Sequence, residues 1–450
     1  MIGRIFVGIS AALLVAVFCM FSMAARAGEP NAARFKHSGH MNPEDQSAAP
    51  QDQAQSAQRQ FTEAPTGFDN KTNGFRPQGE PYELINEDNV VAQRSFNDDR
   101  FIFESAESID EGLGPTYNAQ ACRECHQNVV TGGASQVAEH RTGRLDASGG
   151  FFESLGGSLI QSRATYPGIV ERVAVEDDIR TFRISTNTLG AGFVECIADE
   201  TLLAIRKAQP AELRGIALLV PVLEGDGSAR IGRFGWKNQH ASLVSFAADA
   251  YLNEMGITSP LFPEENPSSG RYVGFGTKYD KVKDPEDEGE DIEAFASFMR
   301  STKAPSRGRI TDDVRTGEAL FAELGCASCH TPTIKTARPG AKINAGAFTV
   351  PAALGNKIIH PYSDFLVHDI GTGDGIPVLP GENYARTSKL MRTAPLWALR
   401  TRNRLMHDGL SSTKQEAIAR HTGQAESVTQ KFDALSGADQ QRILAFLDSL

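Results

Sequence analysis

The chain has 450 residues, which is enough for two or three domains with their own hydrophobic cores. Hydrophobic residues make up 40% of it and charged residues 22%, as in ordinary globular proteins. The formal net charge is −11 at pH 7 and basic residues are not clustered, which argues against a nucleic-acid-binding protein.

The first residues have the pattern of a secretory signal. Arg4 precedes an almost continuous apolar run over 5–23, and Ala25 and Ala27 supply a small-residue cleavage site. We therefore expect residues 1–27 to be a signal peptide that exports the protein to the periplasm. An uncleaved membrane anchor is the alternative, because the apolar run is long for a signal. No later stretch approaches about 18 apolar residues, so no stable membrane insertion is expected after cleavage.

A flexible leader is expected over residues 28–72. This segment is rich in Ala, Gln, Ser, Asn and Pro and has few large apolar residues. Such a composition cannot bury enough apolar surface to offset the entropy of ordering. From residue 73 onward the composition is typical of ordered protein, and a first domain is predicted over 73–308.

The middle of this first domain mixes strand and helix patterns. Polar–apolar alternation over 180–190 predicts a short strand, whereas 199–215, 241–256 and 291–301 have helical spacing. Pro210 interrupts the first of these helices. The domain should therefore be helical with loops and a few short strands.

An acidic run, DPEDEGED at 284–291, precedes the last of these helices. Its simplest interpretation is a solvated loop whose final carboxylates complement the helix N-terminus. Its oxygen ligands are not arranged around a glycine as in a recognisable calcium loop. A calcium site is the alternative interpretation of this run, possible but not indicated by the sequence.

Two Cys-x-x-Cys-His sequences carry the clearest chemistry. In such a sequence two thiols add across the vinyl groups of haem, and the histidine binds the iron. A redox-active cysteine pair or half of a zinc site would be alternatives for a single copy. No further cysteine pair completes a zinc site, and Cys196 is expected to be a small buried apolar residue. The sequence therefore predicts two covalently bound haem c groups, at Cys122, Cys125 and His126 and at Cys326, Cys329 and His330.

Residues 309–450 have the proportions of a cytochrome c domain. A helix over 312–325 precedes the second motif, a loop-rich segment follows, and a helix over 438–450 ends the chain. The apolar faces of these two helices are expected to pack together over the haem. These faces are formed by Leu320, Phe321, Leu324, Ile443, Phe446 and Leu447. The expected fold class is mainly α, with two cytochrome c-like haem domains of which the N-terminal one is enlarged by loops and a few short strands.

Several longer segments carry a resemblance to a known family. They are GLGPTYNAQACRECH, GRFGWKNQHASL, MGITSPLFP, LGCASCHTP, YSDFLVHDIG, RTAPLWALRTRNRLMHDG and EAIARHTGQAE. In this order the chain resembles the bacterial di-haem oxidoreductases of the peroxidase-like branch, which are related to the di-haem cytochrome c peroxidases. The resemblance covers most of the chain after residue 73.

The resemblance also implies a second ligand for the C-terminal haem. In the related peroxidases a segment like that around His407 is followed, on the next helix, by this axial ligand. Here the helix begins at the capping-box pair Thr413 and Glu416 and carries His421, where the relatives often have Met. Met391 and Met406 are the alternatives. Replacing Met by His would lower the reduction potential of the iron, because a thioether favours the reduced metal.

The other face of the first haem is less clearly indicated. The related peroxidases can carry a displaceable histidine shortly after the N-terminal motif, in a loop that contains glycine. His140 has this place in the chain, and Gly132 and Gly133 would supply the mobility. An exposed loop histidine is the alternative interpretation of His140, and His240 is a weaker candidate ligand.

Two further residues are candidates for the chemistry itself. Glu195 lies in an apolar run and is a candidate to move a proton during peroxide cleavage, although an edge or loop carboxylate is the simpler interpretation. Trp236 corresponds to an aromatic that the related enzymes place between the haems for electron transfer, although a core tryptophan is the simpler interpretation. His368 and His407, each followed by Asp, are expected to support other groups and not to bind iron.

The predicted function is a periplasmic di-haem c-type oxidoreductase of peroxidase type. An N-terminal reactive haem would meet peroxide, and a C-terminal low-spin haem would pass electrons from a small soluble donor such as a cytochrome c or a cupredoxin. The alternatives are a non-catalytic electron carrier with two closed haems, and an oxidant of a protein or thiol partner.

Overall fold

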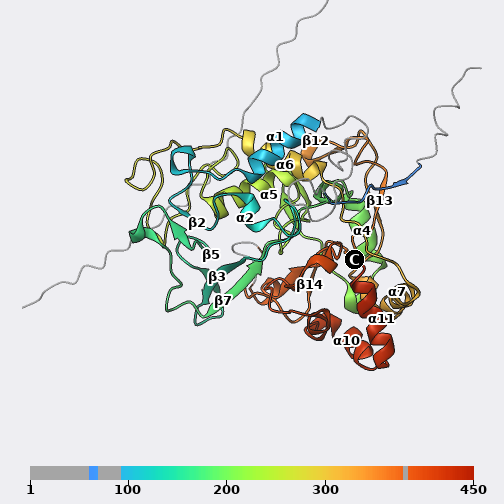
Figure 1. The fold of residues 1–450 in the computed structure, drawn as a ribbon. Coiled ribbons are helices and arrows are strands. Elements are labelled where there is room, and N and C mark those ends of the chain that lie inside the picture. Colours follow the sequence, from blue (N-terminus) through green and yellow to red (C-terminus); the bar gives the residue numbers. More distant parts are fainter. Residues whose placement is uncertain (1–59, 69–92, 379–383) are drawn as a thin grey trace, which may run out of the picture. The chain divides into compact units, whose positions relative to one another are not determined.

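The computed structural model describes residues 60–68, 93–378 and 384–450 (Figure 1). The expected signal peptide lies outside the described residues, as does most of the expected leader. Residues 60–68 of that leader belong to the fold, because strand β1 (Thr62–Glu63) pairs in parallel with β13 (Lys357–Ile359) and Phe68 is buried. No described helix is long and apolar enough to cross a membrane.

The described residues form eleven α-helices. Their bounds are α1 Gln93–Glu104, α2 Cys122–Cys125, α3 Ala191–Glu195, α4 Asp199–Ala208, α5 Leu243–Ala250, α6 Glu290–Ser301, α7 Asp312–Leu324, α8 Tyr384–Thr387, α9 Lys414–Ala419, α10 Glu426–Asp433 and α11 Gly437–Leu447. The predicted helices in 199–215, 241–256, 291–301, 312–325 and 438–450 are confirmed as α4, α5, α6, α7 and α11. Helix α5 continues as a short π-helix, η4 (Tyr251–Met255), which ends at Gly256.

Short strands are a larger part of the fold than the sequence indicates. Besides β1 and β13 they are β2 Thr116–Tyr117, β3 Ala138–Leu145, β4 Phe151–Glu153, β5 Leu159–Ile160, β6 Arg163–Ala164, β7 Ile179–Ile184, β8 Leu219–Pro221, β9 Ala229–Ile231, β10 Ile334–Lys335, β11 Lys342–Ile343, β12 Phe348–Thr349, β14 Val367–Asp369 and β15 Leu390–Arg392. The expectation of a mainly α fold is therefore not confirmed. Periodicity over two or three residues is too short to distinguish such strands from loops.

The longest strands, β3 and β7, form the centre of a four-stranded sheet just after the first motif. β3 pairs antiparallel with β4, β5 and β7, and His140 lies opposite Phe182 in the β3–β7 ladder. Because side chains alternate along a strand, Glu139 and Arg141 point to the face opposite that of His140. This alternation decides which of these residues can reach the first motif.

The largest hydrophobic core joins residues that lie far apart in the sequence. Helices α1, α3, α5 and α6 contribute, among others, Phe193 and Phe298, which are fully buried. Ile334, Leu354 and Phe365, from the segment after the second motif, belong to the same core. Residues from the segment 334–365 therefore pack into the core of the expected N-terminal domain, although they follow the expected domain boundary at 308/309 in the sequence. The described residues within 58–450 group into one unit.

A second core lies over the second motif. Helices α7 and α11 lie side by side (Figure 1), with the rings of Phe321 and Phe446 5.2 Å apart between centroids. The expected packing of the two apolar faces is confirmed, since Leu324, Ile443 and Leu447 are buried in this same core. The pair positions Gly325, which ends α7 in a left-handed conformation and directs the chain into the second motif.

The approach of α7 to α11 gives a test of this packing. A Cβ at Gly317 of α7 would lie 1.9 Å from the backbone oxygen of Arg442. We expect Gly317→Ala to lower the free energy of unfolding by about 1–3 kcal/mol, because backbone cannot yield as a side chain does. Urea unfolding of the haem-loaded protein measures this.

The matched control is Gly437→Ala, at the start of α11, where an added Cβ meets no atom within 4 Å. This control should be close to neutral. Equal stability of the Gly317 variant and the wild type would contradict the close contact between the two helices.

Candidate functional site

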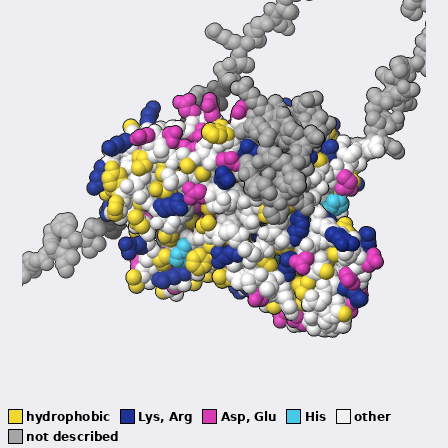
Figure 2. Space-filling view, in the orientation of Figure 1, with side chains coloured by type: hydrophobic (Ala, Val, Ile, Leu, Met, Phe, Trp, Pro, Cys, Tyr) yellow, Lys and Arg dark blue, Asp and Glu magenta, His cyan; other side chains and the backbone are white. Residues whose placement is uncertain are grey.

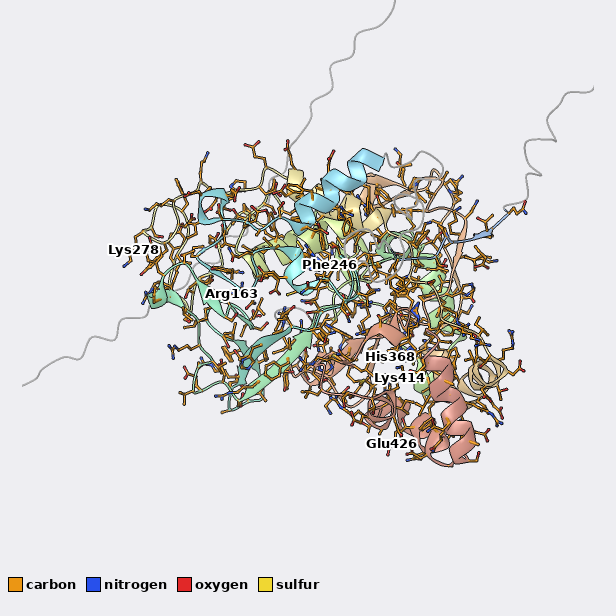
Figure 3. The ribbon with its side chains drawn as sticks, viewed as in Figure 1. Arg163, Phe246, Lys278, His368, Lys414 and Glu426 are labelled. Atoms are coloured by element: carbon orange, nitrogen blue, oxygen red, sulfur yellow. The ribbon has the colours of Figure 1, made fainter. Side chains whose placement is uncertain are left out.

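The second motif opens on a mainly apolar cavity of about 1360 Å³ of atom-free space, part of it open to solvent. Cys326, Cys329 and His330 line it on one side. Met391 and His421 come from later segments, and Figure 3 labels His368 and Lys414, which also line it. The apolar lining and the volume suit a large planar hydrophobic group.

Two imidazoles face each other within this cavity. The ring centroids of His330 and His421 are 6.4 Å apart. Two imidazoles that bind one metal through bonds of about 2.0 Å place their centroids roughly 6.3 Å apart. The two rings therefore have the separation that an iron between them requires.

Backbone carbonyls fix the orientation of both rings. His330 Nδ1 donates to the carbonyl of Tyr362 at 3.0 Å, and His421 Nδ1 donates to that of Ala417 at 2.7 Å. Nε2 of each ring then carries the free lone pair that a metal needs. Burial lowers the pKa of His421, and burial together with the neighbouring His421 lowers that of His330 to about 4. Both rings are neutral at pH 7, as iron ligation requires.

The helix that positions His421 is shorter than the sequence indicates. The capping box of Thr413 and Glu416 is confirmed at the start of α9. The helix ends at Ala419, and His421 lies in the turn that follows. The backbone N–H of His421 donates to the carbonyl of Ile418 at 2.9 Å. Met391 and Met406 line the same cavity, but His421 is the residue whose ring faces His330.

The first motif opens on a second cavity, of about 1090 Å³ of atom-free space. Cys122, Cys125 and His126, on and just after α2, line it together with Phe246, which Figure 3 labels. His126 Nδ1 lies 3.3 Å from the carbonyl oxygen of Gly133, and burial lowers its pKa. The residues present at this motif therefore also fit a covalently attached haem with a neutral histidine ligand.

His140 does not line this cavity. Its ring stacks on Phe182 of β7, with centroids 4.8 Å apart and planes 21° apart, and Phe182 is 41% exposed. The alternation of β3 turns His140 away from the motif and places its neighbours Glu139 and Arg141 in the cavity lining. The structure thus does not bring the predicted distal histidine to the first motif.

A pair of carboxyl side chains belongs to the lining of the first cavity. Glu139 and Glu254 both line the first cavity, and Arg141 pairs with Glu139 at 3.0 Å. Burial and the charge of Glu139 raise the pKa of Glu254 well above its usual value, and Asn118 donates to Glu254 at 3.0 Å. Burial and the neighbouring carboxyl therefore favour the protonated form of Glu254.

This pair was not found from the sequence. Glu254 lies in YLNEMG, which has only helical spacing, and Glu139 and Glu254 are separated by more than 100 residues. Alternation along 138–145 was the one available signal for the direction of Glu139. His240 also lines the cavity, but Ser245 and Asp249 contact its two ring nitrogens at 2.8 and 3.4 Å.

Trp236 lines both cavities. Its indole N–H donates to the carbonyl of Ile184 at 2.7 Å, and its ring meets His407 edge-on with centroids 6.2 Å apart. Trp236 is 9% exposed and packs with Ile184 and Met391. It is thus a buried aromatic that contacts the space at both motifs.

Glu195, the candidate proton donor, belongs to neither of the two cavity linings. It is fully buried and accepts two hydrogen bonds from Arg300, at 2.7 and 3.0 Å, and one each from Leu243 N–H and Asn344. Burial alone would raise its pKa, but the charge and hydrogen bonds of Arg300 lower it. Glu195 is therefore an ionised partner that joins α3, α5 and α6.

The remaining histidines named from the sequence are buried beside the second motif. His368 Nε2 lies 2.8 Å from Asp364, and its Nδ1 is 3.7 Å from the Cys329 sulfur. Burial lowers the pKa of His407 to about 4, so it is neutral at pH 7. Cys196 is fully buried, as expected.

One comparison with known proteins gives the family of the chain. The family model described as "di-haem oxidoreductase, putative peroxidase" matches residues 152–450, well over half of the chain. The protein therefore belongs to the di-haem oxidoreductase family, whose members carry two haems and have a redox role. The matched residues include the second motif and begin after the first. A comparison with curated proteins found no significant match.

Solved structures give distant likenesses. A hydrazine synthase of Kuenenia stuttgartiensis is 13% identical, with 84% of this chain and 96% of that chain covered and a TM-score of 0.36. A MauG-like protein associated with microbial copper homeostasis is 14% identical (87% and 93% covered, TM-score 0.36). The di-haem peroxidase BthA of Burkholderia thailandensis is 15% identical (66% and 92% covered, TM-score 0.28). At these TM-scores the likenesses decide neither fold nor function.

The structural role of Glu195 can be tested directly. Glu195→Gln removes the fully buried counter-charge of Arg300 and leaves only the exposed Glu293 beside it, so we expect the free energy of unfolding to fall by about 3–5 kcal/mol. Thermal or urea unfolding measures the loss. Glu200→Gln, at an exposed position of α4, is the matched control and should be close to neutral. If Glu195→Gln instead abolished reaction with peroxide at unchanged stability, the structural assignment would be wrong.

Proposed function

We propose that the protein is an exported, periplasmic di-haem c-type oxidoreductase of peroxidase type, with unlike roles at its two motifs. The observation that carries the proposal is the difference between the cavities. The second brings His421 opposite His330, whereas the first brings two carboxyl side chains, one of them with a raised pKa, and an arginine. The second cavity suits electron transfer with both axial positions filled, and the first suits binding and cleavage of a small oxidant.

Haem c, attached through Cys122 and Cys125 and through Cys326 and Cys329, would supply the redox-active iron at each motif. His126 and His330 would bind iron through Nε2, since their Nδ1 atoms face the carbonyls of Gly133 and Tyr362. The carbonyl contacts also raise the basicity of the ligating nitrogen.

Glu254 and its neighbours would handle protons at the first cavity. Peroxide cleavage requires a proton to move between the two oxygens. Burial and the charge of Glu139 favour the protonated form of Glu254, and the two carboxyl groups contact each other in the cavity lining. Arg141 pairs with Glu139 and supplies positive charge to the same wall of the cavity. The pair can thus donate a proton and regain it without a histidine.

Trp236 would carry electrons between the sites. It is the aromatic residue that lines both cavities among the described residues, and its hydrogen bond to Ile184 holds the ring in place. The electrons would come from a small soluble donor protein such as a cytochrome c or a cupredoxin. Positive and negative side chains are interspersed on the face shown in Figure 2, which favours no large single-sign docking surface there.

Two variants test the assignments of His421, as a metal ligand, and of His140, as a residue outside the first cavity. His421→Ala should remove one axial ligand and change the spin state of one haem in the optical and EPR spectra, because the facing ring is lost. His140→Ala is the control and should leave both spectra unchanged. His421→Met should raise the reduction potential of the same haem. An unchanged spectrum in His421→Ala would contradict the assignment and favour Met391 or Met406.

The carboxyl pair predicts a pH dependence with a defined sign. The proton on Glu254 is present below its raised pKa and is lost as the pH rises through that value, so reaction with peroxide should slow over the same rise in pH. Glu254→Gln should reduce the rate constant for peroxide by about 10²–10⁴-fold and remove this dependence. Stopped-flow mixing with hydrogen peroxide measures both. Glu176→Gln, which removes the exposed carboxyl of Glu176, is the control.

A second measurement on the same variant is independent of catalysis. In the wild type the folded chain binds more protons than the unfolded chain above the ordinary pKa of Glu254, so its stability falls as the pH rises. The stability of Glu254→Gln relative to the wild type should therefore increase with pH.

A wild-type protein with two low-spin haems that remain inert to peroxide, also after one-electron reduction, would favour the alternative of an electron carrier.

A further inference from the structure

Outside the two cavities, four carboxylates converge in the loop between η4 and α6. Glu265, Asp280, Asp284 and Glu286 each offer one oxygen, and these oxygens all lie within 4.8 Å of one another. Lys278, labelled in Figure 3, marks this loop. Only Asp284 and Glu286 belong to the acidic run noted in the sequence, which is why the run alone does not indicate a site.

Each of the four side chains has one buried oxygen without a hydrogen-bond partner. One oxygen of each side chain is inaccessible to solvent and accepts no hydrogen bond, namely Glu265 Oε1, Asp280 Oδ2, Asp284 Oδ1 and Glu286 Oε1. Asp280 as a whole is only 7% exposed. Buried carboxylate oxygens without partners are costly, and native proteins rarely leave them so.

Backbone hydrogen bonds aim two of these side chains. Asp280 Oδ1 accepts from Val282 N–H at 3.0 Å, and Glu286 Oε2 accepts from Thr258 N–H at 2.8 Å. Each carboxylate is thus held by one oxygen while the other points into the cluster. The other oxygen of each group, Asp280 Oδ2 and Glu286 Oε1, remains a buried acceptor without a donor.

The cluster is also electrostatically unfavourable without a cation. Burial, with the charges of the three neighbours, raises the pKa of Glu265 to about 9, and burial raises that of Glu286 to about 7. Full ionisation of all four groups therefore needs a compensating positive charge. No described lysine or arginine donates to the four unpaired oxygens.

We propose that Glu265, Asp280, Asp284 and Glu286 bind a calcium ion. The donors are all carboxylate oxygens, which suit a hard cation and not zinc or copper, and no sulfur or imidazole belongs to the group. Calcium accepts six to eight oxygens in an irregular arrangement, with carboxylates that bind through one or both oxygens. Magnesium demands a nearly octahedral shell and retains several waters, which suits a nearly solvent-free carboxylate cluster less well.

The position of the cluster indicates what the ion would do. Glu286 holds Thr258, two residues after Gly256, and Gly256 ends the π-helix that carries Glu254 into the first cavity. A Cβ at Gly112 would lie 2.6 Å from Glu286 Cγ, so the loop also packs closely against the turn before β2. The ion would fix the loop and thereby support one wall of the first cavity. The proposal does not rest on the proposed function.

The test uses the full-length, haem-loaded protein after removal of divalent cations with a chelator. Added calcium should bind by isothermal titration calorimetry and raise Tm by roughly 2–8 °C. Metal analysis after dialysis should find one calcium per chain fewer in Asp280→Asn and in Glu265→Gln than in the wild type. Magnesium at the same concentration should have a smaller effect.

Two neighbouring residues give matched controls. Glu264→Gln and Glu288→Gln remove exposed carboxylates next to cluster residues and should retain wild-type calcium content and the wild-type rise in Tm. Wild-type calcium binding in both cluster variants would overturn the proposal, as would a wild type that neither binds calcium nor gains stability from it. A larger response to magnesium or manganese would overturn the choice of ion. None of these readouts involves peroxide or the haem spectra, so failure here is distinct from failure of the proposed function.

Discussion

The hydrogen bond from a motif histidine to a backbone carbonyl is the constraint on which both sites depend. At the second motif Tyr362 receives the Nδ1 proton of His330, and Ala417 receives that of His421. A protonated Nδ1 leaves Nε2 as the metal-binding nitrogen and fixes the plane of each ring. Without these contacts the two rings would not remain at the separation that one iron requires. The packing around the cavity would then no longer hold two oriented metal ligands.

The difference between the two cavities follows from local backbone geometry. The turn after α9 directs His421 into the second cavity, whereas the pleat of β3 directs His140 out of the first and Glu139 into it. A shift of one residue in β3 would exchange these directions. The chemistry available at the first motif is therefore set by the register of a strand, and at the second by the end of a helix.

The residues expected to attach the haem groups could be predicted from the sequence better than the residues that line the two cavities. The spacing of each Cys-x-x-Cys-His sequence is local, and so is the capping box of Thr413 and Glu416, so both could be predicted from neighbouring residues. Glu139, Glu254 and the calcium-site candidate Glu265 come together only through long-range packing, which periodicity does not report. Glu195 shows the converse, because a carboxylate in an apolar run resembles a catalytic acid until the bidentate Arg300 is seen.

The packing of segment 334–365 into the first core bears on the order of folding. Phe193 and Phe298 acquire neighbours such as Leu354 and Ile359 only after both motifs have left the ribosome, and β1 pairs with β13 across almost three hundred intervening residues. Such non-local contacts close late, because loop entropy opposes them until the partner strand arrives. The first core therefore reaches its final packing only after residues 334–365 join it, so its completion depends on a segment that follows both motifs in the chain.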